Sequence, residues 1–126
     1  MKRPMQILIL ANHSGGLYDF RKDLIAELKT HASVAVAVPH NDRWDELNGL
    51  ADRVIELPID RRGMNPLHDG KLFRQYRAIL GEIKPDLVLT YTIKPNIYGG
   101  LACRMAHIPY AVNITGLGSA IENGGW

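Results

Sequence analysis

The chain has 126 residues, enough for one compact domain with a core of its own. Hydrophobic residues make up 46% of it and charged residues 22%, proportions that are typical of a globular protein. The net charge of +2 gives no support to a nucleic-acid partner, and a single cysteine excludes an internal disulfide and favours a reducing compartment. No apolar run approaches the length of a membrane span, so we expect a soluble, cytoplasmic protein.

The first predicted element is a buried strand that leads into a helix. Residues 5–11 form an almost continuous apolar run, as in a parallel strand covered on both faces. Residues 12–16 follow as a short polar loop with two glycines. The apolar stripe of the next helix is predicted to hold Leu17, Phe20, Leu24 and Leu28. Such a strand, loop and helix open a doubly wound fold, in which ligands bind at the carboxyl ends of the strands.

Strands and helices alternate through the rest of the chain. Further strands are predicted at residues 33–38, 53–57, 87–91 and 110–114. A short helix capped by Asn41 or Asp42 ends near residue 50, a long one lies between residues 66 and 85, and a third covers residues 97–107. This alternation predicts an α/β fold, a Rossmann-like doubly wound parallel sheet of about five strands with helices on both faces. We expect residues 1–126 to form a single domain.

Familiar cofactor and metal signatures fail in this chain. The early glycine pair lacks the spacing of a dinucleotide fingerprint, and Gly16 with Arg21 and Lys22 lacks the second glycine and the hydroxyl residue of a phosphate-binding loop. No histidine pair has metal-ligand spacing on a helix. We therefore expect no cofactor, no metal and no catalytic residue, and we interpret Cys103 as a small buried hydrophobe.

Four segments taken in order resemble a known enzyme family. They are Met64-Asn65-Pro66-Leu67, Lys84-Pro85-Asp86-Leu87-Val88, Thr92-Ile93-Lys94-Pro95 and Asn113-Ile114-Thr115-Gly116-Leu117-Gly118. Together they resemble the amino-terminal domain of family 4 glycosyltransferases of GT-B architecture that build bacterial capsule, exopolysaccharide or lipopolysaccharide. The resemblance implies an acceptor-side domain, with the nucleotide-sugar donor held by a second Rossmann-like domain. We therefore expect a fragment that lacks the donor-binding domain and transfers no hexosyl unit alone.

Candidate substrate-binding residues follow the first, fourth and fifth predicted strands. They are Asn12, His13, Ser14, Gly15, Gly16, Lys94, Thr115 and Gly116. Glycine amides at a helix start approach a phosphate or sugar hydroxyl closely, and Lys94 suits an anionic acceptor such as a polyprenyl diphosphate. The structural alternatives are a tight glycine turn and a solvated lysine. The resemblance implies a sugar-contacting histidine where this chain has Thr115, whose hydroxyl donates a hydrogen bond but cannot act as a general base.

The resemblance also implies partners. These are a nucleotide-sugar donor, bound mostly by the missing domain, and a lipid-linked or glycan acceptor. Six basic residues around the long helix suit either peripheral contact with an anionic membrane at its inner face or simple solvation; they are Arg61, Arg62, Lys71, Arg74, Arg77 and Lys84. An exposed cleft face would favour self-association. Two alternatives stay open: a nucleotide-sugar 2-epimerase-like domain, whose early arginine-rich loop is missing here, and a non-catalytic flavodoxin-like binding module, for which no flavin loop is found.

Overall fold

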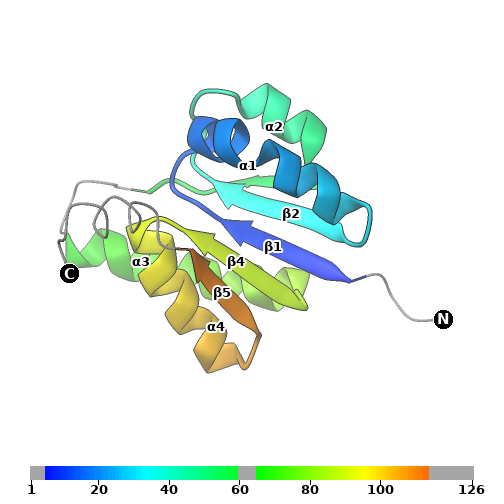
Figure 1. Cartoon of the computed structure of the whole chain (residues 1–126). Coiled ribbons are helices and arrows are strands. Elements are labelled where there is room, and N and C mark those ends of the chain that lie inside the picture. Colours follow the sequence, from blue (N-terminus) through cyan, green and yellow to red (C-terminus); the bar gives the residue numbers. More distant parts are fainter. Residues whose placement is uncertain (1–4, 60–64, 114–126) are drawn as a thin grey trace, which may run out of the picture.

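The computed structural model describes residues 5–59 and 65–113 and contains a five-stranded parallel sheet (Figure 1). The strands are β1 Gln6–Leu10, β2 Ser33–Val38, β3 Arg53–Glu56, β4 Leu87–Tyr91 and β5 Tyr110–Asn113, in the spatial order β3-β2-β1-β4-β5. The helices are α1 Ser14–Lys29, α2 Trp44–Leu50, α3 Pro66–Ile83 and α4 Gly100–Ala106, with a π-helical turn, η1 Pro95–Gly99, directly before α4. The strand order reverses between β1 and β4, which confirms the predicted doubly wound fold.

Helices cover both faces of the sheet, α1 and α2 on one and α3 and α4 on the other (Figure 1). Along β1, Ile7 and Ile9 belong to the core under α1 and α2, whereas Leu8 and Leu10 belong to the core under α3 and α4. Successive side chains of a strand point to opposite faces of the sheet. An uninterrupted apolar run is therefore what a strand with two covered faces requires, and this is why β1 could be recognised in the sequence.

Two aspartates fix the strand register at the amino edge of the sheet. The Asp86 carboxylate, just before β4, accepts a hydrogen bond from the backbone amide of Gln6 in β1 at 2.8 Å. Asp52, just before β3, accepts one from the amide of Val34 in β2, also at 2.8 Å. Each carboxylate therefore ties the start of its own strand to the neighbouring strand.

The predicted apolar stripe of α1 is partly wrong. Leu17 and Ile25 are buried, but Phe20 is 79% exposed and Leu24 is 37% exposed. The helix begins at Ser14, which is itself buried, and packs on the sheet with the side that holds Ser14, Leu17 and Ile25. The hydrophobic periodicity was compatible with burial of either Phe20 and Leu24 or the neighbouring stripe that holds Ile25. In the folded chain, packing against the sheet buries the stripe that holds Ile25.

The predicted side-chain cap of α2 is also wrong. The residue before this helix is Arg43, in a left-handed conformation with φ of 63°, and no side-chain hydrogen bond caps the helix there. The backbone groups of Asn41 and Asp42 instead bond to Ser14 at the start of α1. A tertiary contact, rather than local capping, therefore sets the conformation of the loop between β2 and α2.

Cys103 lies in α4 and is fully buried, as expected for a small hydrophobe. Burial disfavours the thiolate and raises the pKa of the Cys103 thiol from 9.0 to about 11. The unfolded chain releases this proton at lower pH, so the free energy of unfolding should fall as the pH rises from 9 through 11. We expect a thiol-specific disulfide reagent to react with Cys103 only after the chain unfolds, with absorbance of the released thiolate as the measurement.

The control for this prediction is Cys103→Ala, which should flatten the decline in stability above pH 9. Part of the decline should persist, because burial also raises the pKa of the Tyr76 phenol, which packs in the same core. Fast reaction of Cys103 in the native protein would contradict the buried placement of the thiol.

Candidate functional site

The carboxyl edge of the sheet brings together two of the three predicted segments. Residues 12–16 follow β1 and Lys94 follows β4, and these two strands are hydrogen-bonded neighbours running in the same direction. Loops that follow adjacent parallel strands emerge at one edge of the sheet, where open α/β folds bind ligands (Figure 1). Thr115 and Gly116, predicted to follow the fifth strand, lie outside the described residues.

His13 is the amino-terminal cap of α1. Its Nδ1 accepts a hydrogen bond from the backbone amide of Gly16 at 2.9 Å. An accepting Nδ1 requires the neutral tautomer with the proton on Nε2. The helix therefore begins before the two glycines, and Gly15 and Gly16 form its first turn rather than the free loop expected from the sequence. The positive end of the helix dipole lies at this edge.

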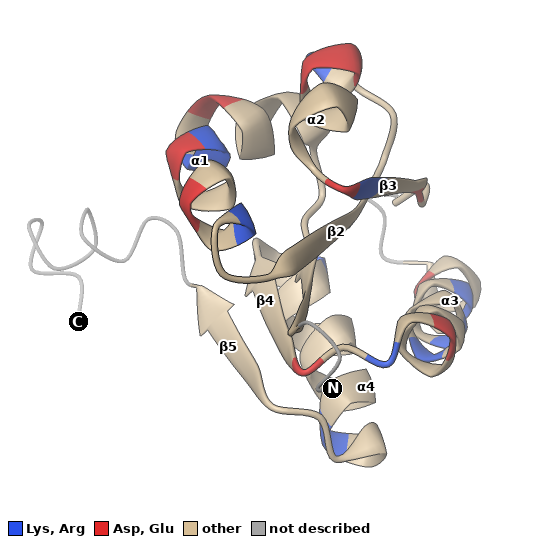
Figure 2. Ribbon diagram, turned by 90° about the vertical axis from the view of Figure 1, so that its right-hand side faces the viewer, with Lys and Arg blue, Asp and Glu red and all other residues tan. Residues whose placement is uncertain are grey.

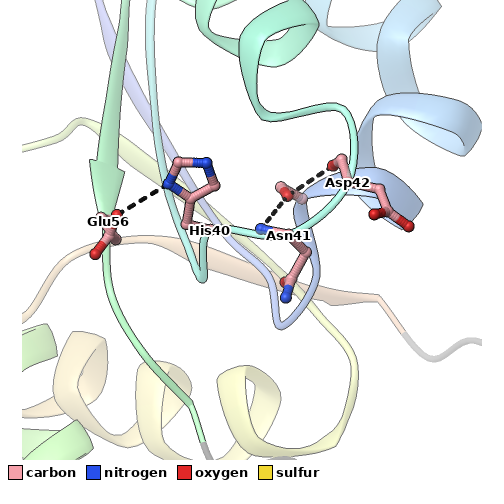
Figure 3. Close-up of polar contacts among 5 residues, drawn as sticks. His40, Asn41, Asp42 and Glu56 are labelled. Carbon is pink, nitrogen blue, oxygen red and sulfur yellow. Dashed lines mark hydrogen bonds and ion pairs between the residues drawn. The ribbon is translucent and has the colours of Figure 1, made fainter.

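Ser14 joins the loop after β1 to the loop after β2. Its fully buried hydroxyl donates to the Asp42 carbonyl at 2.8 Å and accepts from the Asn41 amide at 2.9 Å (Figure 3). Next to it, a Cβ added to Gly15 would lie 3.0 Å from the Asp42 Cβ and 3.2 Å from the Asp42 carbonyl oxygen. Gly15 is therefore required for close packing of the two loops, and neither Gly15 nor Gly16 adopts a positive φ.

The loop after β2 adds residues that the sequence analysis missed. The His40 ring stacks on Trp44 with centroids 4.2 Å apart and an interplanar angle of 15°. Figure 3 shows the same ring turned toward Glu56 at the end of β3, with His40 Nδ1 and Glu56 Oε1 3.2 Å apart. Only the pairing of β2 with β3 brings these groups together, because sixteen residues separate His40 from Glu56.

Lys94 is held in an ion pair and is not the solvated lysine of the structural alternative. Its Nζ lies 2.8 Å from Asp69 Oδ1, and the two side chains are only 14% and 18% exposed. The Tyr98 hydroxyl donates to Asp69 Oδ2 at 2.9 Å, and this hydrogen bond is the main cause of a raised pKa for Tyr98. Asp69 lies near the start of α3, so the cluster connects α3 with the turn after β4.

A second polar network fixes the turn between β4 and α4. Buried Thr90 donates through Oγ1 to Asn96 Oδ1 at 2.8 Å, and Asn96 Nδ2 donates to the Asn113 carbonyl at 3.0 Å. Asn113 Nδ2 in turn donates to the Thr90 carbonyl at 3.2 Å. Thr92 takes a left-handed conformation, with φ of 73°, and its hydroxyl donates to the Tyr91 carbonyl. The segment that presents Lys94 is therefore tied to both β4 and β5.

The described part of the edge offers hydrogen-bond donors, a helix amino end and the His40–Glu56 pair. The imidazole of His13 presents its Nε2 proton, and Lys94 follows the neighbouring strand β4. Within residues 5–59 and 65–113, no group of three or more histidines, cysteines or carboxylates could hold a metal ion. Hydrogen-bond donors of this kind are the groups with which proteins contact hydroxyl-rich or anionic ligands.

Comparison with known proteins gives a family match over almost the whole chain. Residues 6–124 match the glycosyl transferase 4-like family. Over 117 residues the chain is 32% identical to the N,N'-diacetylbacillosaminyl-diphospho-undecaprenol alpha-1,3-N-acetylgalactosaminyltransferase of Campylobacter jejuni, covering 91% of this chain and 31% of that protein. The chain thus spans less than a third of the length of this curated relative.

Solved structures show the same fold at low sequence identity. A calicheamicin glycosyltransferase superposes with a TM-score of 0.69 at 17% identity, over 90% of this chain and 33% of that one. A UDP-N-acetylglucosamine 2-epimerase gives a TM-score of 0.67, also at 17% identity, over 87% of this chain and 33% of that one. At such identities these similarities establish the fold alone, so the epimerase alternative gains no functional support from them.

Proposed function

This chain belongs to the glycosyl transferase 4-like family, and from that premise we propose that it is the acceptor-side domain of a GT-B glycosyltransferase. The enzyme moves a hexosyl unit from a nucleotide-sugar donor to a lipid-linked or polysaccharide acceptor. The observation that carries this proposal is the 32% identity, over 91% of the chain, with a transferase whose name describes a sugar-diphospho-undecaprenol acceptor.

The carboxyl edge supports an acceptor role for residues 12–16 and Lys94. The positive end of the α1 dipole and the His13 Nε2 proton favour sugar hydroxyls or an anion here, and in this proposal the Lys94 ammonium contacts the acceptor diphosphate in addition to Asp69. Asp69 holds that ammonium in a defined position, and the Tyr98 hydroxyl in turn donates to Asp69. A group fixed in this way loses little conformational freedom when a ligand binds, which favours specificity. On the family resemblance we propose Thr115 and Gly116 as further acceptor-binding residues.

We propose that residues 1–126 form one domain and that transfer also requires a separate donor-binding domain. The chain should therefore bind acceptor but transfer no sugar by itself. The test incubates the 126-residue chain with a panel of nucleotide sugars and polyprenyl-diphosphate-linked glycans, and measures product by mass spectrometry. Robust sugar transfer by this chain alone would overturn the proposal that transfer requires a separate donor-binding domain.

Acceptor binding has its own measurement. A water-soluble analogue with a short prenyl tail should shift the amide resonances of residues 12–16, 92–94 and 96, whereas a nucleotide sugar alone should leave them in place. Residues 26–31, at the far end of α1, serve as the internal reference. If the nucleotide sugar shifts the resonances of residues 12–16, 92–94 and 96 and the acceptor analogue does not, these residues bind the donor rather than the acceptor.

The proposed location is cytoplasmic, at the inner face of the cell membrane. None of the helices among the described residues is long and apolar enough to cross a bilayer. A glycan on a polyprenyl diphosphate is nevertheless anchored in the membrane, so the domain has to work at the membrane surface. Self-association through the carboxyl edge is a further proposal, and concentration-dependent sedimentation measures it.

A further inference from the structure

The outer surface of η1 and α4 carries an apolar stripe. Ile97, Leu101 and Met105 recur at intervals of four residues and are 55%, 47% and 50% exposed. Side chains four residues apart lie on one side of a helix. At the start of neighbouring α3, Leu67 is 80% exposed. Large apolar groups therefore gather on the outer side of the layer formed by α3, η1 and α4.

Basic residues flank this stripe along α3 and α4. Lys71, Arg74 and Arg77 on α3 and Arg104 on α4 are all exposed. Between the two helices lies a groove of about 500 Å³ whose lining includes Arg77, Leu80, Ala102 and Ala106. Arg77 and Lys84 thus line a groove that also has aliphatic side chains, and the apolar stripe lies on the next helix. We call the outer surface made by Leu67, Lys71, Arg74, Arg77, Ile97, Leu101, Arg104 and Met105 the α3–α4 face.

The carboxylates of α3 are paired with basic side chains. Asp69 is mostly buried against Lys94, and Glu82 forms an ion pair with Arg53 of β3 at 2.7 Å. The helices on the two faces of the sheet differ in charge, as Figure 2 shows. Helices α1 and α2 contain five acidic and three basic residues, whereas α3, η1 and α4 contain four basic and two acidic ones.

We propose that the α3–α4 face docks on an anionic lipid bilayer. Apolar side chains surrounded by lysine and arginine are typical of helices that lie at a membrane interface. The stripe of Ile97, Leu101 and Met105 enters the boundary between headgroups and acyl chains, and the arginines lie at the level of the lipid phosphates. The more acidic layer of α1 and α2 then faces away from the bilayer, which favours one orientation of the domain.

This inference rests on the proposed function, because a lipid-linked acceptor is reached from the bilayer. It goes further by assigning the contact surface to one side of the fold. A second copy of the chain is the competing occupant of this face. The bilayer is favoured because the face combines apolar groups with positive charge, whereas a copy that presented the same face would place like charges opposite one another.

Vesicle sedimentation tests the proposal. The chain should bind vesicles that contain phosphatidylglycerol and bind poorly to vesicles of phosphatidylcholine alone, and 0.5 M salt should weaken the binding. Arg77→Gln combined with Met105→Ser should lower the partition coefficient at least tenfold, since one basic residue near the surface accounts for about fivefold. The matched control, Lys22→Gln with Phe20→Ser on α1, removes the same types of side chain from the opposite layer and should retain binding.

A second pair, Arg74→Gln with Ile97→Ser, repeats the test if the first variant unfolds by circular dichroism. Equal losses of vesicle binding in the α3–α4 face variants and the control variant would overturn the assignment of this face as the membrane contact. Unchanged vesicle binding in both face variants would overturn it as well. Salt-sensitive dimers in the absence of vesicles, lost in the face variants only, would assign the face to a second copy. Acceptor binding measured in solution separates the two proposals. If the chain binds vesicles but not the acceptor analogue, the acceptor role is rejected. If it binds the acceptor analogue but not vesicles, only membrane docking is rejected.

Discussion

Gly99→Ala is expected to lower the free energy of unfolding by about 1–3 kcal/mol, the usual cost of overpacking a core. Gly99 ends the π-helical turn η1 and is buried. An added Cβ would lie 2.6 Å from Leu10 Cδ1, 3.4 Å from Thr90 Cγ2 and 3.8 Å from Tyr76 Cε2. Leu10 is completely buried at the end of β1, so a shift of its methyl group has to displace other core side chains. The added methyl group therefore displaces η1 and the carboxyl end of β1 together.

The matched control for this variant is Gly81→Ala in α3. A Cβ at Gly81 would meet nothing within 4 Å, and the position lies inside a helix. Replacing a helical glycine with alanine should raise stability by about 0.5–1 kcal/mol. Urea denaturation of both variants, with the midpoint compared at unchanged slope, measures the difference. Equal stability of the two variants would show that Leu10 moves aside freely and that η1 is loosely packed.

Ser14→Ala is expected to destabilise the protein by about 1–2 kcal/mol, because it removes the shared hydrogen-bond partner of two partly buried backbone groups. The hydroxyl holds the Asn41 amide at 2.9 Å and the Asp42 carbonyl at 2.8 Å. Alanine restores neither bond, and Ser14 is fully buried on its side of the contact. The loops after β1 and β2 should then separate, and acceptor binding by residues 12–16 should weaken with them.

Thr30→Ala gives the corresponding exposed control. The Thr30 hydroxyl donates to the Glu27 carbonyl at 2.7 Å at the surface, where water can take its place. Its loss should cost less than about 0.5 kcal/mol, as for most surface substitutions. Hydrogen exchange provides the local readout, since the Asn41 amide should exchange faster in Ser14→Ala than in the parent chain. An unchanged exchange rate at Asn41 would mean that the hydroxyl does not hold the loop.

The strand and helix assignments follow from local patterns, and most of them could be predicted. An apolar run with turn residues at its ends identifies β1, and the buried positions of α3 recur with helical period. In α1 the hydrophobic periodicity was compatible with two different buried faces of the helix. The prediction placed Phe20 in the core, although it lies on the surface. The predicted cap of α2 was wrong because the backbone groups of Asn41 and Asp42 bond to Ser14, a residue far from them in the chain.

The sequence by itself determined the fold class, the family resemblance and the placement of residues 12–16 and Lys94 after neighbouring parallel strands. Only the tertiary structure decided what these side chains contact: His13 caps α1, Ser14 joins two loops, and Lys94 pairs with Asp69. The physical reason is the sequence distance over which each kind of information is encoded. Hydrophobic periodicity and turn propensity are encoded over a few residues, whereas Lys94 and Asp69 are 25 residues apart and meet only when α3 packs beside the turn after β4.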